Sequence, residues 1–281
     1  MIITSDFHIH SEYSYDASLP LSEIAENAKS FGFRKIGITD HVNFNDESFL
    51  GDLASSAKGV GEFRKTHSEM ILGVELTPIE KPEFDYIAKR GTREGYIPPV
   101  SEKLYEIELA VTKEQLIEHG VRYAIGAAHW RGDVPNGRKL PADRDAEIRE
   151  WYRQQMWLAN DPRVTVLGHP WWNPSGVWYE DFSVIPRSMH MDIAESLLKN
   201  KKYVEYNSSG LFDNKSEKFR MQYAEFIREL FEMGIPVTYG SDSHKQYIDK
   251  RTEVEKVLYE VGFREGDFSE IRDEDLWVAE V

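Results

Sequence analysis

Six of the nine histidines in this sequence lie where short apolar runs end, a position that suits metal-binding or catalytic side chains. His8 and His10 close the first run, and their spacing of two would point both imidazoles to the same face of a strand. Side chains of similar chemistry follow later runs: His41, Glu75, His129, His169, Asp242 and His244. A single histidine at a strand end is more often structural, but six in register with two carboxylates predict a shared metal site.

These ligand types also indicate which metals the site would hold. Imidazole and carboxylate groups without thiolate suit zinc, iron or manganese, and the chain has no cysteine. The candidate ligands are more than one ion takes, so a cluster of two or three divalent ions is predicted. Ions about 3.5–4 Å apart can share a bridging water, lower its pKa and clamp the attacking and leaving oxygens of a phosphate. The other histidines are expected on the surface or at a helix end: His67, His119 and His190.

The elements that must position these side chains follow a regular rhythm. Short apolar runs predict strands at residues 2–4, 35–39, 70–74, 123–127, 164–168, 203–206 and 236–240. Helical patterns lie between them at residues 20–32, 112–120, 143–160, 191–200, 217–234 and 252–262. Alternation of this kind predicts a parallel sheet covered by helices. Seven or eight such units close into a barrel whose chemistry lies at the C-terminal ends of the strands.

Residues 77–111 break this rhythm. The segment is rich in charged residues and contains Gly91, Gly95, Pro98 and Pro99. Long segments without an expected element are often functional, so we interpret it as an insertion after the third strand, either a hairpin or lid over the site or a surface excursion.

Composition limits the classes of function that fit the chain. Its 281 residues, 41% hydrophobic and 30% charged, are typical of a soluble globular protein. No apolar run is long enough to cross a membrane, and the start lacks a signal-peptide pattern, so a cytoplasmic location is expected. A net charge of −15 argues against binding a long nucleic acid, but metal-bound carboxylates would still admit a small phosphorylated substrate.

The motifs, taken in order, resemble those of the PHP family (polymerase and histidinol phosphatase domain). The matching segments are His8-Ile9-His10-Ser11 with Asp16 behind it, Thr39-Asp40-His41, Gly73-Val74-Glu75, Ala128-His129, Gly168-His169-Pro170 and Gly240-Ser241-Asp242-Ser243-His244. They span residues 8 to 244, which is most of the chain. The resemblance implies one domain over residues 1–281, folded as a distorted (β/α)7 barrel of the TIM-like kind, with a trinuclear metal site at the strand ends.

The resemblance also implies how the ligands divide among three ions. The first ion would be held by His8, His10, Glu75 and Asp242. The second would be held by Glu75, which bridges, together with His129 and His169. The third would be held by Asp16, His41 and His244.

A hydrolytic mechanism follows as a hypothesis. A hydroxide that bridges two ions would attack phosphorus in line, and Asp242 or His244 would protonate the leaving alkoxide. Four residues near predicted ligands are candidates for substrate binding: Arg131, Trp171, Asn207 and Lys245. The two basic residues could instead be ordinary surface charges, Asn207 a support for the cluster, and Trp171 packing at the barrel rim. Trp130 and Trp172 are candidates for the pocket wall on the same grounds.

Four functions are compatible with such a site. The first is a small-molecule phosphomonoesterase with a histidinol-phosphate-like substrate. The second is a nucleotide or short-oligonucleotide phosphoesterase, for which Trp171 and Trp172 could stack on a base. The third is a metal-dependent amidohydrolase, which usually carries a bridging lysine where this chain has Glu75. The fourth is a non-catalytic metal-binding module, which the complete ligand set disfavours.

Overall fold

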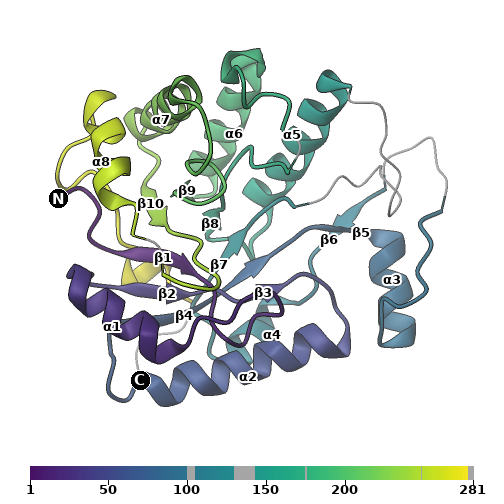
Figure 1. Cartoon of the computed structure of the whole chain (residues 1–281). Helices are drawn as coiled ribbons and strands as arrows, with labels where there is room; N and C mark the ends of the chain where they lie inside the picture. Colours follow the sequence, from purple (N-terminus) through teal and green to yellow (C-terminus); the bar gives the residue numbers. More distant parts are fainter. Residues whose placement is uncertain (100–104, 130–142, 175, 248, 278–281) are drawn as a thin grey trace.

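Seven parallel strands form the central barrel in the computed structural model, which describes residues 1–99, 105–129, 143–174, 176–247 and 249–277. In barrel order they are β1 (Asp6–Ile9), β2 (Ile36–Ile38), β4 (Met70–Leu76), β7 (Tyr123–Gly126), β8 (Val166–Leu167), β9 (Tyr203–Asn207) and β10 (Val237–Gly240). A short strand, β3 (His41–Val42), follows β2 and also pairs with β4. The barrel closes where β10 meets β1. There the backbone N–H of His10 donates to Ser243 O at 2.9 Å, and the backbone N–H of Asp242 donates to His8 O at 2.8 Å. The (β/α) barrel predicted from the sequence is therefore confirmed (Figure 1).

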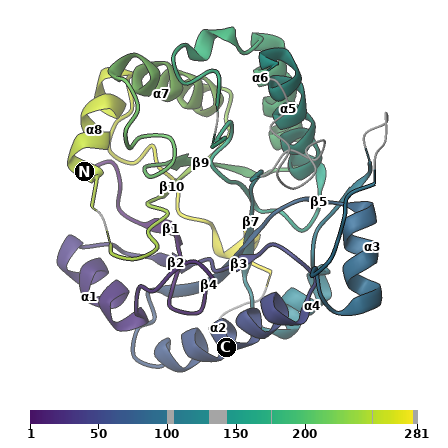
Figure 2. The same ribbon diagram turned by 45° about the vertical axis from the view of Figure 1, so that its right-hand side comes forward.

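Helices surround this ring of strands on the outside (Figure 2). They are α1 (Leu21–Phe31), α2 (Glu47–Phe63), α4 (Lys113–Glu118), α5 (Arg144–Asn160), α6 (Arg187–Lys199), α7 (Glu217–Glu232) and α8 (Arg251–Glu260). Because helices cover the outside and side chains fill the inside, the strands are buried on both faces, which explains their almost continuous apolar runs. None of the helices in the described ranges is long and apolar enough to pass through a bilayer.

Two elements differ from the sequence prediction. The first strand is Asp6–Ile9 and not residues 2–4, so His8 lies within the strand and His10 directly after it. Ile2 and Ile3 are buried in the core without joining the sheet. Helix α2 was not predicted at all, although Asp46 caps its start by accepting from the backbone N–H of Phe49.

The segment 77–111 contains two short strands and a helix. These are β5 (Ile79–Glu80), α3 (Lys81–Arg90) and β6 (Ile107–Glu108), and the two strands pair antiparallel, as in a hairpin. The segment lies at the side of the barrel, where α3 and β5 are drawn in Figure 1. Its apolar residues Ile79 and Ile87 form a small cluster with Phe44 and Phe49, which precede and begin α2. Its role as a lid stays a prediction.

A buried tyrosine, Tyr123, belongs to the apolar cluster that fills the interior of the barrel. Tyr123 on β7 is fully buried, and its hydroxyl donates to Phe7 O at 2.6 Å. Two facing glycines make room for it, because a Cβ at Gly37 would lie 1.8 Å from the Tyr123 Oη and one at Gly73 would lie 2.6 Å from its ring. The same apolar cluster includes Ile271 from the C-terminal segment, so that segment packs against the barrel interior.

His190 was expected on the surface but is buried in an aromatic cluster. Its ring stacks on Phe182 at 5.3 Å between centroids and lies 4.4 Å from that of Phe226. Burial lowers the pKa of His190 to about 4, so the imidazole is neutral at pH 7. The alternation of apolar and polar residues around α6 did not reveal this position, since histidine is usually counted as polar.

This buried histidine makes stability depend on pH in a defined direction. The pKa of His190 is lower in the folded state than the ordinary value of 6.5, so its contribution is complete above about pH 6.5 and is lost as the pH falls toward 4. The expected loss is about 2–3 kcal/mol between pH 7.5 and 4.5. Urea unfolding with a chelator present measures it. His190→Leu should lose less stability on acidification than wild type, and His119→Gln should behave as wild type. Equal losses in wild type and His190→Leu would contradict the assignment.

Candidate metal centre

The strand ends bring all nine predicted ligands to one mouth of the barrel. Three groups of ligand atoms, each within 4.8 Å of one another, contain most of them. These groups are His8 with His10 and Glu75; Glu75 with His129 and His169; and His10 with Asp16, His41 and His244. Asp242 adjoins the first group, because its Oδ1 lies 3.3 Å from His10 Nε2 and 3.7 Å from His8 Nε2. The grouping agrees with the predicted ligand sets, except that His10 also lies beside the third set.

Glu75 lies at the centre of the cluster. Its Oε2 is 3.3, 3.4 and 2.9 Å from nitrogens of His8, His10 and His41. Its Oε1 is 3.0 and 3.4 Å from the Nε2 atoms of His169 and His129. Burial alone would raise the pKa of Glu75, but the surrounding histidines hold it well below its usual range. The carboxylate thus stays ionised, with Oε2 facing ligands of the first and third groups and Oε1 facing those of the second.

Asp16 completes the third group from the loop that follows β1. Its Oδ2 lies 3.4 Å from His41 Nε2 and 3.5 Å from His244 Nε2. The Nδ1 of His244 donates to the main-chain oxygen of Asp242 at 3.0 Å. Since that nitrogen carries the proton, Nε2 of His244 is the nitrogen that would bind a cation shared with Asp16.

The nitrogen and oxygen atoms of the cluster are arranged as ligands of divalent cations and not as hydrogen-bond partners of one another. The Nε2 atoms of His8 and His10 lie 3.1 Å apart, although both face the same carboxylate oxygen. That oxygen, Glu75 Oε2, is buried and has no hydrogen-bond partner in the described part of the protein. Leaving a carboxylate oxygen buried without compensation is costly, so converging lone pairs of this kind indicate a place for a cation.

Hydrogen bonds behind the ligands fix how the imidazoles are oriented. The hydroxyl of Thr77 donates to Asn43 Oδ1 at 2.5 Å, so its oxygen is left to accept from His129 Nδ1 at 2.7 Å. The lone pair of His129 then lies on Nε2, the nitrogen that faces Glu75. Burial lowers the pKa of His129 to about 3, which keeps this ring neutral and able to bind metal.

The sequence-based prediction missed a buried carboxylate of the site, Glu205. It lies on β9, is 1% exposed, and accepts from His8 Nδ1 at 2.7 Å and from the backbone N–H of His169 at 2.5 Å. The available signal was its spacing from Asn207, which repeats the spacing of two seen for the histidines of the first strand.

Asn207, predicted either to bind substrate or to support the cluster, is held by hydrogen bonds inside the protein. The residue is fully buried, and its Oδ1 accepts from the backbone N–H groups of Ser209 and Gly210 at 2.9 and 3.0 Å. Its Nδ2 lies 3.3 Å from Asp242 Oδ2 and 3.4 Å from Glu205 Oε1. With oxygen and nitrogen both used inside the protein, Asn207 orients Asp242.

The tryptophan beside the cluster is Trp172 and not Trp171. Trp171 is fully buried, and its ring packs against Trp178 and His190 with centroids 5.8 and 5.7 Å apart. This packing leaves Trp171 without exposed surface, as the alternative of packing at the barrel rim expects. The ring of Trp172 lies 5.4 Å from that of His129 and 5.5 Å from that of His169. The predicted contacts of Trp130 and Arg131 lie outside the described residues.

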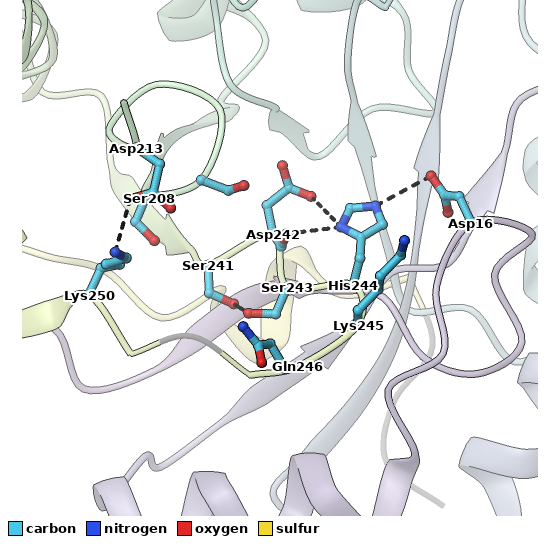
Figure 3. A pocket seen from close by; sticks show the side chains of 11 residues that line it. Asp16, Ser208, Asp213, Ser241, Asp242, Ser243, His244, Lys245, Gln246 and Lys250 are labelled. Atoms are coloured by element: carbon cyan, nitrogen blue, oxygen red, sulfur yellow. Dashed lines mark hydrogen bonds and ion pairs between the residues drawn. The ribbon is translucent and has the colours of Figure 1, made fainter. Parts of the chain in front are cut away.

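A cavity of about 640 Å³ opens beside the third group of ligands. Asp16, Asp242 and His244 line one part of it, as Figure 3 shows. The rest of the lining is polar: Ser208, Ser209, Asp213, Ser241, Ser243, Lys245, Gln246 and Lys250. The Nζ of Lys250 lies 3.1 Å from Asp213 Oδ1 in an ion pair, whereas Lys245 is exposed next to His244. The cavity volume lies within the range of small-molecule sites.

Fold and site together define a barrel protein with a histidine–carboxylate metal centre at its strand ends. The chain belongs to the PHP domain family, whose model matches residues 6–261. The family identified from the sequence motifs is therefore confirmed.

Comparison with individual proteins gives more distant similarities. The chain is 24% identical to a probable histidinol-phosphatase from Thermotoga maritima, over 91% of this chain and 90% of that protein. It is 34% identical to the uncharacterized protein MJ1295 from Methanocaldococcus jannaschii, over 31% of this chain and 39% of that one. Its fold is similar to that of histidinol phosphate phosphatase from Lactococcus lactis, with a TM-score of 0.66 at 19% identity, covering 94% and 96% of the two chains.

Proposed function

We propose that this protein is a metal-dependent phosphatase that hydrolyses a small phosphate monoester, with histidinol phosphate as the first candidate substrate. The position of Glu75 carries the proposal, since one buried carboxylate faces five histidines from all three ligand groups. The family supports it, as does the relative named as a probable histidinol-phosphatase. The Lactococcus lactis enzyme of similar fold was crystallised with zinc, L-histidinol and phosphate, which are a metal and the two products of that reaction.

Two or three ions of zinc, manganese or iron would occupy the three ligand groups. His8, His10, Glu75 and Asp242 would hold one, Glu75 with His129 and His169 the next, and Asp16 with His41 and His244 the last. When bound, these ions would lower the pKa of an attacking water and neutralise charge on the phosphoryl group. The protein side chains supply the orientation and the buried surroundings that make those effects strong.

The alcohol part of the substrate would lie in the cavity beside the third group. Asp242 and His244, whose side chains are 17% and 28% exposed, both line this cavity, and either would protonate the leaving alkoxide while it is not bound to an ion. Lys245 lines it too and would attract the phosphate group by its charge. The serines, the amide of Gln246 and the Asp213–Lys250 pair suit an alcohol that carries further polar groups.

Removal and replacement of metal tests the proposal directly. We expect complete chelation to lower phosphate release at least about 10³-fold, because several kcal/mol of charge stabilisation are lost. Zinc, manganese or iron should restore it. The substrates to compare are histidinol phosphate and nucleoside mono- and bisphosphates, measured as kcat/KM with each metal.

Histidinol phosphate is expected to give the highest kcat/KM in this comparison. A clear preference for a nucleotide would replace that substrate and would assign Trp172 to base stacking. Phosphate release that survives complete chelation, or none from any substrate with any metal, would overturn the proposal.

A further inference from the structure

Strand β9 supplies none of the nine predicted ligands, although it lies between β8 and β10, each of which leads into a ligand. Its contribution is a carboxylate behind the ligands. Glu205 and Asn207 are two residues apart and both are buried, with Glu205 next to His8 and His169. Glu205 does not line the cavity beside the metal centre, so a direct contact with the substrate there is excluded.

The two oxygens of Glu205 serve two different ligand groups. Oε1 accepts a hydrogen bond of 2.7 Å from His8, which belongs to the first group. Oε2 accepts one of 2.5 Å from the backbone N–H of His169, which belongs to the second. Hydrogen bonds to a carboxylate are stronger than those between neutral groups, and burial strengthens them further.

The first hydrogen bond determines the tautomer of His8. A carboxylate can only accept, so Nδ1 of His8 must carry the proton. Its Nε2, which lies 3.3 Å from Glu75 Oε2, is then the nitrogen that would bind a cation shared with that oxygen. The opposite tautomer would place a proton where the cation should be.

The second hydrogen bond holds the backbone at the end of β8. His169 has a positive φ of 20°, which is uncommon for a residue with a side chain. With its N–H held by Glu205, the imidazole of His169 reaches Glu75 Oε1 at 3.0 Å. The bond therefore offsets an unfavourable backbone conformation that the ligand position requires.

A glycine on the neighbouring strand allows this arrangement. A Cβ added at Gly240 on β10 would lie 1.8 Å from Glu205 Oε1 and 2.7 Å from the Cβ of His8. Only glycine leaves the space through which the carboxylate of β9 reaches the histidine of β1.

We propose that Glu205 is a positioning residue that prepares two metal sites at once, by fixing the tautomer of His8 and the backbone of His169. The inference rests on the metal centre of the proposed function and not on its substrate. Loss of the carboxylate should weaken metal binding in both groups, because one side chain orients a ligand of each.

Glu205→Gln tests this with nearly the same shape. An amide oxygen can accept from only one of the two N–H donors, and the amide NH2 then faces the other. If the NH2 group faces His8, the proton of that ring must move from Nδ1 to Nε2. If it faces His169, it repels the backbone N–H and displaces the backbone. We expect the affinity for zinc, measured by competition with a chelating dye, to fall about 10–100-fold. In the metal-loaded enzyme kcat should fall while KM changes little.

The matched control is Glu255→Gln. Glu255 also accepts two backbone N–H groups, from Ile2 and Ile3 at 2.8 and 2.9 Å, but away from the cluster. This variant should bind zinc as wild type does. Glu205→Asp, which keeps both acceptor oxygens on a shorter side chain, should bind zinc with an affinity between those of wild type and Glu205→Gln.

Nitrogen-15 NMR of the histidine rings in zinc-loaded wild type supplies a readout that does not depend on any variant. The proposal requires the Nδ1–H tautomer for His8, and the Nε2–H tautomer would overturn it even if Glu205→Gln fails to fold. Wild-type zinc affinity in a folded Glu205→Gln protein would also overturn it. Zinc binding that depends on Glu205 in a protein without phosphatase activity would instead contradict only the proposed function, and wild type that binds no zinc would contradict both.

Discussion

Glu75→Gln is expected to lower kcat/KM for phosphate ester hydrolysis at least about 10³-fold and to remove most of the bound metal. Glutamine has almost the same shape, so the barrel should fold. The amide lacks the negative charge and can offer only one good donor atom, whereas the carboxylate faces His8, His10 and His41 with one oxygen and His129 and His169 with the other. Because Glu75 contacts histidines of all three groups, its replacement should weaken metal binding in each of them.

Elemental analysis of the dialysed protein and steady-state kinetics measure the two effects. The control is Glu80→Gln, because Glu80 is also buried and lies five residues further along, outside the three ligand groups. It should keep its metal and its activity. Full metal content with more than a tenth of the activity in Glu75→Gln would show that Glu75 does not bridge.

Tyr123→Ala is expected to cost about 4 kcal/mol of the free energy of unfolding, in the range for removing a buried aromatic ring. The ring fills the space left by Gly37 and Gly73, whose missing side chains would otherwise collide with it. Backbone on both sides of the ring belongs to paired strands, so collapse into the new cavity is limited. The substitution also leaves Phe7 O without the hydroxyl that donates to it at 2.6 Å.

Tyr123→Phe separates the ring from its hydroxyl. It removes only the hydrogen bond and should cost about 1 kcal/mol. Urea unfolding of both variants without metal gives the comparison. Similar losses in the two variants would show that the barrel interior can close over the missing ring.

The barrel could be predicted from the sequence because the residues that form each strand are recognisable from their own stretch of sequence. Parallel strands covered on both faces need apolar residues at nearly every position, and this pattern is visible without knowing the fold. The exception, α2, has buried Phe49, Leu53 and Val60 at helical spacing, but its glycines argue against a helix. Gly59 is explained only by the tertiary structure, since a Cβ there would lie 2.4 Å from the ring of Tyr13.

The ligand positions could be predicted for a similar reason, since strand ends converge in any parallel barrel. The residues that support or surround the ligands could not. Glu205 acts on His8, which is 197 residues away, so its role depends on which strands become neighbours. Which of Trp171 and Trp172 faces the ligands depends on the backbone conformation, because φ is positive at His169 and at Trp171. The alternation expected of an extended chain therefore does not apply there, and Trp172 faces the histidines.

The closure of β10 against β1 has a consequence for how the protein is made. His8 and His10 precede Asp242 and His244 by more than 230 residues, so they leave the ribosome well before them. Two of the three ligand groups can assemble without β10, but the third and the full set around His8 cannot. The nascent chain thus holds an incomplete set of ligands until β10 has been made, and the complete centre forms only when β10 docks against β1.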